Sequence, residues 1–385
     1  MSFRLSVVRF ALALLCVATN SLVAADDAAL QALFTAANEK LNASDYKGAI
    51  EDYNEILEKE PKADNVWAAR GLAKMSLQDL SGARVDFAQA ISLNPKHENA
   101  YRWRGSLRYN QKDFTGSAED FTKAIAIKAG DAILHGARAE VYRALQDNDR
   151  ALADLNRAIE LDPDMVPALY MRGQIHEENE NTSSALADYS RVIRLDPSHG
   201  DAINQRGWIK FARQDWSGAI EDATKILALA PQTAIALRLA GYAQFGQGDY
   251  AAAAALLTQA ADLAPDDSAY PLYIRHFALL RTGAADKRLA TSWGGWTKRP
   301  WSQSIARFIV GQLTEEEFEN AAQGTTDDSE LAGWTCEMHF YIGLARLQAG
   351  DKSTARLRFQ SALAMNQKSY IEDSLAHAEL KRLAK

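Results

Sequence analysis

Small and large apolar residues recur along this chain with a period of 34 residues. Units that begin at Leu30, Asp64, Glu98, Ala132, Val166, Gly200 and Ala234 carry glycine or alanine at their eighth position and a small residue at their twentieth. Six of the nine prolines share this lattice, namely Pro61, Pro95, Pro163, Pro197, Pro231 and Pro265. A fixed period of this length indicates an array of short structural repeats rather than two or three globular domains.

The residues within a unit predict two antiparallel helices. A small side chain at position 8 lets the helices approach, a large one at position 24, such as Phe87 or Tyr189, fills the neighbouring gap, and proline ends the second helix. This arrangement resembles the tetratricopeptide-repeat family, whose unit is a 34-residue helix-turn-helix. The sequence therefore predicts an all-α fold, a tetratricopeptide-repeat superhelix (α-solenoid) with an elaborated helical C-terminal cap.

The lattice also predicts the boundaries of the parts. We expect a signal peptide at residues 1–25, seven tandem repeats within 26–267, an eighth first helix with a tryptophan-rich insert in 268–335, and a final repeat-like unit with a capping helix in 336–385. The final unit is indicated by Gly343, Ala355, Phe359 and Ala362, which stand at the same offsets as in the earlier repeats. Within the insert, Leu313 to Phe318 has the pattern of a capped helix start.

Opposite charges occupy two further lattice positions. Arginine stands at position 7 as Arg70, Arg104, Arg138, Arg172 and Arg206, and aspartate at position 23 as Asp52, Asp86, Asp120, Asp154, Asp188 and Asp222. Because an unpaired charge beside the close-packed positions is costly, we expect a structural ladder of ion pairs rather than a row that binds anions or catalyses. Two pairings are open: within a unit, which joins Arg70 to Asp86, or across units, which joins Asp52 to Arg70.

The first helices predict a binding surface. In tetratricopeptide arrays they line a concave groove, and positions 2, 5, 9 and 12 share that helix face. These positions hold Asn99, Arg102, Tyr109, Tyr170, Gln174, Asn204, Trp208, Phe211, Arg238, Tyr242 and Phe245. Aromatic and arginine side chains are typical anchors for protein or peptide partners. The alternative is that the C-terminal part of the chain fills the groove itself, and the lysine at position 5 that chaperone-binding relatives use is absent.

The C-terminal part resembles a more specific family, the NlpI-like tetratricopeptide lipoproteins of the bacterial envelope. The resemblance depends on Pro300, Trp301, Ile305, Phe308 and Gly311, on Cys336, Glu337, Phe340, Tyr341 and Gly343, and on Tyr370, Ile371, Glu372, Ala376, Glu379 and Leu380. It implies a non-enzymatic, homodimeric adaptor that docks peptidoglycan hydrolases and envelope proteases at the outer membrane. This chain departs from that family because it lacks the lipid-bearing cysteine.

The N-terminal residues predict export. Arg4 and Arg9 precede an apolar run from Phe10 to Val17 that is too short to span a bilayer, and small residues then lead to Asp26, the expected mature start. Cys16 lies inside the apolar run, so we expect no lipid anchor and a periplasmic or secreted protein without a transmembrane segment. Cleavage lowers the 43 basic residues to 41 against 50 acidic ones, a balance that disfavours nucleic acid as a partner.

Sequence motifs for chemistry are missing. The seven histidines form no metal-binding pair of the H-E-x-x-H kind, and there is no Walker loop, dinucleotide fingerprint or G-x-S-x-G elbow. We read Cys336 and His339, three residues apart, as ordinary packing. We therefore expect no catalytic residues, cofactor or metal, and a scaffold that binds envelope proteins, such as cell-wall hydrolases or proteases. The alternatives are a general peptide-binding or chaperone-like module, and an enzyme that uses the tryptophan-rich insert.

Overall fold

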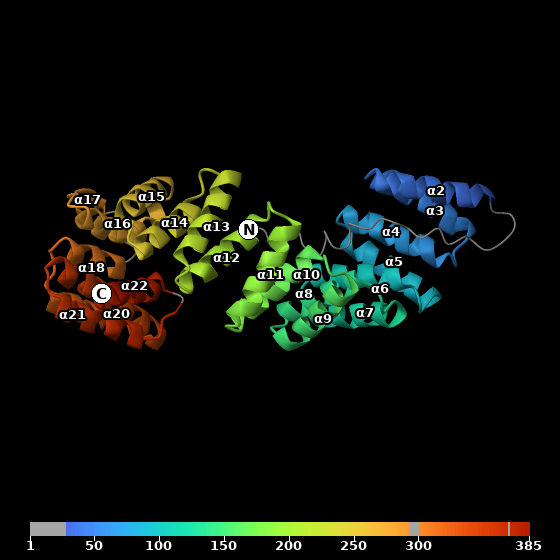
Figure 1. Cartoon of the computed structure of the whole chain (residues 1–385). Helices are drawn as coiled ribbons and strands as arrows, with labels where there is room; N and C mark the ends of the chain where they lie inside the picture. Colours follow the sequence, from blue (N-terminus) through green and yellow to red (C-terminus); the bar gives the residue numbers. More distant parts are fainter. Residues whose placement is uncertain (1–27, 293–299, 369) are drawn as a thin grey trace. The chain divides into compact units, whose positions relative to one another are not determined.

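The computed structural model describes residues 28–292, 300–368 and 370–385, and all regular secondary structure in these ranges is helical (Figure 1). The expected all-α tetratricopeptide fold is confirmed. The chain divides into two compact units, Met1–Asn181 and Thr182–Lys385, and each is described by itself. The boundary falls inside the repeat that begins at Val166, between its two helices.

The first unit consists of antiparallel helix pairs in chain order. Its helices are α2 (Ala28–Asn42), α3 (Tyr46–Lys59), α4 (Asp64–Ser76), α5 (Leu80–Leu93), α6 (Glu98–Asn110), α7 (Phe114–Ile127), α8 (Ala132–Ala144), α9 (Asn148–Leu161) and α10 (Val166–Glu178). Each helix packs against the next one along the chain.

The second unit continues the pairs and then adds the C-terminal elements. Its helices are α11 (Thr182–Leu195), α12 (Gly200–Ala212), α13 (Trp216–Leu229), α14 (Ala234–Gln247), α15 (Tyr250–Leu263), the 3₁₀ turn η2 (Pro265–Asp267), α16 (Ala269–Arg281), α17 (Arg288–Ser292), α18 (Pro300–Ile309), α19 (Glu315–Ala322), α20 (Asp328–Gln348), α21 (Lys352–Ala364) and α22 (Ile371–Leu383). Helix α16 is the eighth first helix that the lattice predicts.

The turn inside each repeat has one geometry. In the second repeat, Gln78 adopts a left-handed conformation (φ 65°), and the side chain of Asp79 then accepts a hydrogen bond from the Gly82 amide at 2.9 Å, which caps α5. In the repeat that begins at Ala234 the left-handed position is a glycine, Gly248 (φ 100°), which adopts this conformation without strain. The short turn and the cap together fix the two helices as an antiparallel pair.

Small residues at position 8 allow the two helices of a repeat to pack closely. A Cβ atom added at Gly71 would lie 2.7 Å from a ring carbon of Phe87. The final unit repeats this contact, because a Cβ atom at Gly343 would lie 2.6 Å from the Phe359 ring. Helices α20 and α21 therefore pack in the way that α4 and α5 do.

The tryptophan-rich insert forms part of the core of the second unit. Trp301 of α18 stacks on Trp334 of α20 with ring centroids 5.1 Å apart, and Thr314 with Glu317 forms the capping box that opens α19. Helix α20 already begins at Asp328, so the first helix of the final unit is longer than a start near residue 336 implies. Trp293 and Trp296 lie outside the described residues.

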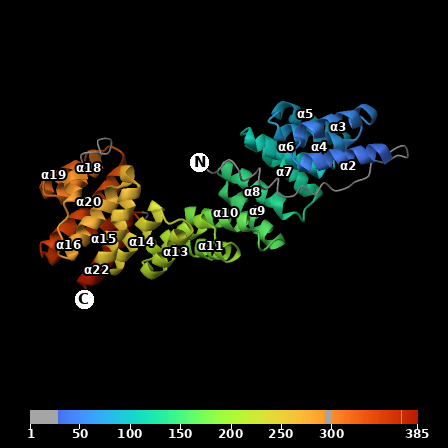
Figure 2. The same cartoon turned by 90° about the horizontal axis from the view of Figure 1, so that it is seen from above.

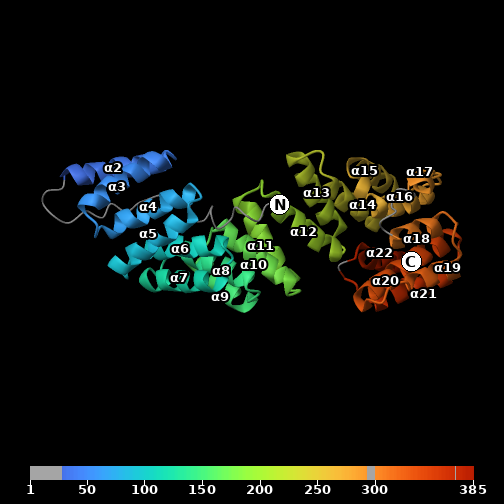
Figure 3. The same cartoon turned by 180° about the vertical axis from the view of Figure 1, so that it is seen from behind.

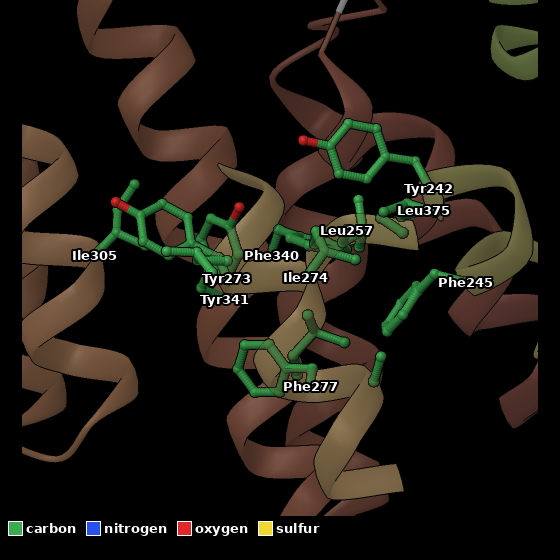
Figure 4. Packing of buried hydrophobic residues seen from close by; sticks show 14 of the residues in the cluster. Tyr242, Phe245, Leu257, Tyr273, Ile274, Phe277, Ile305, Phe340, Tyr341 and Leu375 are labelled. Carbon is green, nitrogen blue, oxygen red and sulfur yellow. The ribbon is translucent and has the colours of Figure 1, made fainter. Parts of the chain in front are cut away.

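The last helix returns to the repeats of its own unit. Helix α22 contacts α12, α14, α20 and α21, which are all labelled in Figure 3. Figure 2 shows the same helix at the C-terminal end of the chain. Its Leu375 lies in the same buried cluster as Tyr242 and Phe245 of α14 (Figure 4). The C-terminal cap is therefore held against the face of the first helices of the second unit.

The predicted signal peptide, residues 1–25, lies outside the described residues. Among the helices that the structure describes, none combines the length and the apolar character that crossing a membrane requires.

Candidate functional site

The arginine and aspartate rows meet within four of the repeats. Arg70 donates two hydrogen bonds of 2.9 Å, from Nε and Nη2, to the two carboxylate oxygens of Asp86. The same bidentate pair joins Arg104 to Asp120, Arg138 to Asp154 and Arg206 to Asp222. Asp52 instead forms an ion pair with Lys40 at 2.7 Å. Arg172 belongs to the first unit and Asp188 to the second, so their pairing stays a prediction.

A third hydrogen bond links several of these arginines to the preceding repeat. The Nη1 atom of Arg70 donates to Asn54 at 2.6 Å, that of Arg138 to Thr122 at 2.9 Å, and that of Arg206 to Ser190 at 3.2 Å. Hydrogen bonding to the carboxylate raises the pKa of Arg104 and of Arg138 above the ordinary value. Each such guanidinium thus joins two helices of its own repeat and one of the neighbour, which favours a structural role for the row.

The predicted groove residues of the first unit lie on α6 and α10. Asn99, Tyr109, Tyr170 and Gln174 are all partly exposed. The Tyr109 hydroxyl donates to Glu140 at 3.4 Å, and Gln174 accepts a hydrogen bond from Arg143 at 2.8 Å, so side chains of adjacent first helices touch along this face. Burial raises the pKa of Tyr109 to about 12.

Arg102 does not belong to the open part of this surface. Its side chain is buried, 3.9 Å from the Glu98 carboxylate and over the Trp103 ring. Position 5 of this repeat therefore faces inward, where a partner cannot reach the guanidinium without displacing its neighbours.

In the second unit the groove is filled by the chain itself. Phe211, Tyr242 and Phe245 are 2%, 3% and 0% exposed, so they do not face an open groove as predicted. Helix α22 contacts α12 and α14 on this face. The sequence leaves two possibilities for the groove, which is either open or occupied by the C-terminal part of the chain. In this unit it is occupied.

Polar contacts fasten α22 to the repeats. Arg382 donates to the backbone oxygens of Phe245, at 2.9 Å, and of Gly246, and it forms an ion pair of 2.6 Å with Glu379. Glu379, which is fully buried, also pairs with Arg281 of α16 at 3.2 Å. Two carbonyls at the end of α14 thereby accept hydrogen bonds from a side chain of α22.

A cavity of about 490 Å³ lies beside the start of α22. It is lined by Trp208, Ile235, Arg238, Tyr242, Tyr270, Trp334, Glu337, Tyr370, Ile371 and Glu372. The structure thus brings three predicted groove residues, Trp208, Arg238 and Tyr242, to one site. The sequence analysis did not assign the other lining residues to a site. Ile235 comes from α14, and the rest come from α16, α20 and the start of α22, which follow the seven regular repeats.

Two glutamates lie at the bottom of this cavity. Glu337 is 2% exposed and accepts hydrogen bonds from Tyr270 at 2.8 Å and from the Trp301 indole; Glu372 is 1% exposed and accepts one from Tyr341 at 2.8 Å. Burial raises the pKa of Glu337 to about 7, and burial together with repulsion from Glu337 raises the pKa of Glu372 to about 8.

Cys336 and His339, the other two residues considered for chemistry, lie in surroundings that disfavour reactivity. Cys336 is fully buried, and burial raises the pKa of its thiol, so the reactive thiolate is disfavoured. His339 lies 3.2 Å from Arg358, and burial lowers its pKa. Over the described ranges, no group of three or more histidine, cysteine and acidic side chains is placed to hold a metal ion.

Solved structures share the fold. The C-terminal part of a TPR repeat-containing protein from Cytophaga hutchinsonii is 16% identical; the match covers 62% of this chain and 99% of that one, with a TM-score of 0.54. A tetratricopeptide repeat protein from Parabacteroides merdae is 17% identical over 65% of this chain and 98% of that one (TM-score 0.45). YrrB, a TPR protein with an unusual peptide-binding site, is 21% identical over 48% and 95% (TM-score 0.43). At 16% identity, the match to the Cytophaga protein shows the fold alone.

The family comparison covers more of the chain. The tetratricopeptide-repeat family model matches residues 34–91, 68–132, 137–199 and 204–268, which together make more than half of the sequence. This fold is typically a scaffold for protein or peptide partners. The chain therefore belongs to the tetratricopeptide-repeat family.

Proposed function

We propose that this chain is an exported, non-enzymatic scaffold that binds a protein partner through the first-helix face of its first unit. The observation that carries the proposal is the contrast between the two units. In the second, the first-helix face binds a helix, α22, and Phe211, Tyr242 and Phe245 are buried. In the first, the equivalent residues Asn99, Tyr109, Tyr170 and Gln174 keep part of their surface exposed.

The contacts of α22 indicate what such a face can hold. The helix places Leu375 in the apolar cluster and Arg382 against backbone carbonyls of α14. A partner helix or extended segment with alternating apolar and polar residues would find tyrosine rings and amide groups on α6 and α10 in the same way. Aromatic side chains of this kind supply much of the energy of protein interfaces.

Binding through this face is tested by crosslinked capture. The tagged chain is crosslinked in an envelope extract, and the captured proteins of wild type and of the double variant Tyr109→Ala/Tyr170→Ala are compared by mass spectrometry. We expect the variant to lose the partner. Val85→Ala, an apolar and 62% exposed position on α5, serves as the matched control and keeps it. Equal capture by all three proteins would overturn the proposed surface.

The proposal also covers the class of partner and the location of the protein in the cell. The NlpI-like pattern of the C-terminal part supports an envelope adaptor, a homodimer that docks cell-wall hydrolases or proteases, and the charge balance argues against nucleic acid. We expect the exported protein to begin at Asp26, to sediment as a dimer and to leave peptidoglycan and peptides intact when purified. Mass spectrometry of the mature N-terminus, ultracentrifugation and turnover assays check the three statements, and a captured set without any cell-wall or proteolytic enzyme contradicts the adaptor role.

A further inference from the structure

The cavity at the start of α22 combines aromatic walls with an acidic floor. Five of its lining residues are aromatic: Trp208, Tyr242, Tyr270, Trp334 and Tyr370. Its volume of about 490 Å³ falls within the usual range of ligand sites, roughly 300–1,000 Å³. Trp208, Trp334 and Tyr370 are partly exposed, whereas Glu337 and Glu372 are buried, so the carboxylates lie at the inner end.

The two carboxylates lack a positive partner. Their hydrogen-bond donors are the neutral groups of Tyr270, Trp301 and Tyr341. Within the described part of the chain, neither glutamate forms an ion pair, and no side chain donates to the second oxygen of Glu372. Two buried carboxylates without a cation cost free energy that a bound positive group would recover.

The other ionisable groups around the cavity do not supply this charge. Arg238 lines it from α14, but its guanidinium is already paired with Asp267. Burial raises the pKa of the four neighbouring tyrosines, Tyr242, Tyr270, Tyr341 and Tyr370, and of Cys336, so all of them are neutral between pH 6 and pH 8.5. The site is therefore acidic whenever its glutamates are ionised.

The aromatic walls suit an organic cation. A ring face attracts a positive group within about 6 Å, and the attraction grows when water is excluded. The walls are also held in place: Trp334 stacks on Trp301, which donates to Glu337, and the rings of Trp208 and Tyr242 lie 6.4 Å apart. The carboxylates would repel an anion, and a neutral ligand would leave their charges uncompensated.

We propose that this cavity binds an organic cation, namely the ammonium or guanidinium group of a lysine or arginine side chain of a bound polypeptide. The assignment to a polypeptide rests on the proposed scaffold function. The positive group contacts Glu337 and Glu372, and its methylene chain lies between Trp208, Tyr242 and Trp334. Free small amines carry the same positive group. The test distinguishes their binding from the binding of a peptide.

The test uses the full mature chain and calorimetric titration with n-butylammonium, n-butylguanidinium and the neutral isostere n-butanol. Two further probes are the peptides acetyl-Gly-Ser-Lys-Ser-Gly-amide and its norleucine counterpart. We expect the cations and the lysine peptide to bind, and the neutral compounds not to bind. Affinity for the cations should rise about tenfold or more from pH 6 to pH 8.5, because the glutamates ionise over this range while the ligands stay charged.

Variants locate the binding. Glu337→Gln/Glu372→Gln keeps the shape of both side chains and should weaken cation binding at least about tenfold, whereas Glu316→Gln, at an exposed position of α19, should change nothing. Trp208→Leu, which lies outside the carboxylate network, should cost about fivefold through the lost ring face. Melting curves establish that the variants fold.

The outcomes are distinct. Absence of cation binding, or binding that is insensitive to pH and to the double glutamine variant, overturns the proposal. Binding of butylammonium without binding of the lysine peptide overturns the assignment to a polypeptide. Loss of partner capture in Tyr109→Ala/Tyr170→Ala concerns the first unit alone, so the scaffold function stands or fails independently of this cavity.

Discussion

Arg206 holds Asp222 with two hydrogen bonds, from Nε at 2.9 Å and from Nη2 at 2.6 Å, and it reaches Ser190 of the preceding repeat with a third at 3.2 Å. Lys210 adds a second cation to the same carboxylate at 2.8 Å. Asp222 itself is fully buried. A single carboxylate thus pairs with both cations and holds them against the second helix of its repeat.

Removing this carboxylate should destabilise the second unit strongly. In Asp222→Ala, the charges of Arg206 and Lys210 lose their partner in a poorly hydrated site, for which we expect a loss of about 3–5 kcal/mol in the free energy of unfolding. Urea unfolding monitored by the fluorescence of Trp208 and Trp216 measures it. Asp201→Ala, at an exposed position of α12, is the control and should change stability by less than about 0.5 kcal/mol. A loss below about 1 kcal/mol in Asp222→Ala would contradict a stabilising role of the pair.

The close helix contact makes a second prediction. In Gly71→Ala the added methyl group would lie 2.7 Å from the Phe87 ring, so the helices of this repeat must separate. We expect a loss of about 1–3 kcal/mol. The matched control is Gly200→Ala at the start of α12, where no atom lies within 4 Å of the new methyl group and alanine favours the helix. The packing argument would be refuted if the denaturant midpoints of the two variants shifted equally and in the same direction.

The repeated contacts could be predicted because each occurs several times in one sequence. Gly71 beside Phe87, and Gly343 beside Phe359, obey one spacing, and a spacing that recurs identifies both partners at once. The charge rows left two pairings open, since spacing alone does not state which neighbour Arg70 faces. Coordinates were needed to join it to Asp86.

The cavity is a different case. Trp208, Arg238 and Tyr242 follow from the lattice, but Tyr370 and Glu372 come from a segment that has no repeated copy to compare with. Where α22 lies depends on tertiary contacts such as Leu375 in the core, which no local pattern encodes. The sequence therefore predicted the residues that the first helices contribute to the site but did not predict its two buried glutamates.

The attachment of α22 is testable at one residue. Leu375 is fully buried in the cluster that contains Tyr242 and Phe245, so Leu375→Ala leaves a cavity between α22 and α14. We expect a loss of about 2–5 kcal/mol and increased binding of an apolar fluorescent dye. His377→Ala, on the exposed side of the same helix, should leave dye binding unchanged. If dye binding stays at the wild-type level in Leu375→Ala although stability falls, α22 does not cover the apolar face in the way the structure shows.

The buried glutamates should make the second unit less stable as pH rises. Folding raises the pKa of Glu337 from its ordinary value of 4.5 to about 7 and that of Glu372 to about 8, so between pH 4.5 and pH 8 the folded state binds more protons than the unfolded state. The stabilisation from these two groups is therefore greatest at and below about pH 4.5 and is lost progressively as the pH rises to about pH 8.

Urea unfolding of the second unit at pH 5, 6, 7, 8 and 9 measures this slope, with the tryptophan signal as the probe. In Glu337→Gln/Glu372→Gln neither side chain can ionise, so most of the decline between pH 5 and pH 8 should disappear, whereas Glu316→Gln should retain it. Because a bound cation stabilises only the ionised glutamates, butylammonium should restore part of the lost stability at pH 8.5 and none at pH 5. A wild-type curve that is flat from pH 5 to pH 8 would show that these carboxylates ionise in the folded protein as easily as in the unfolded chain.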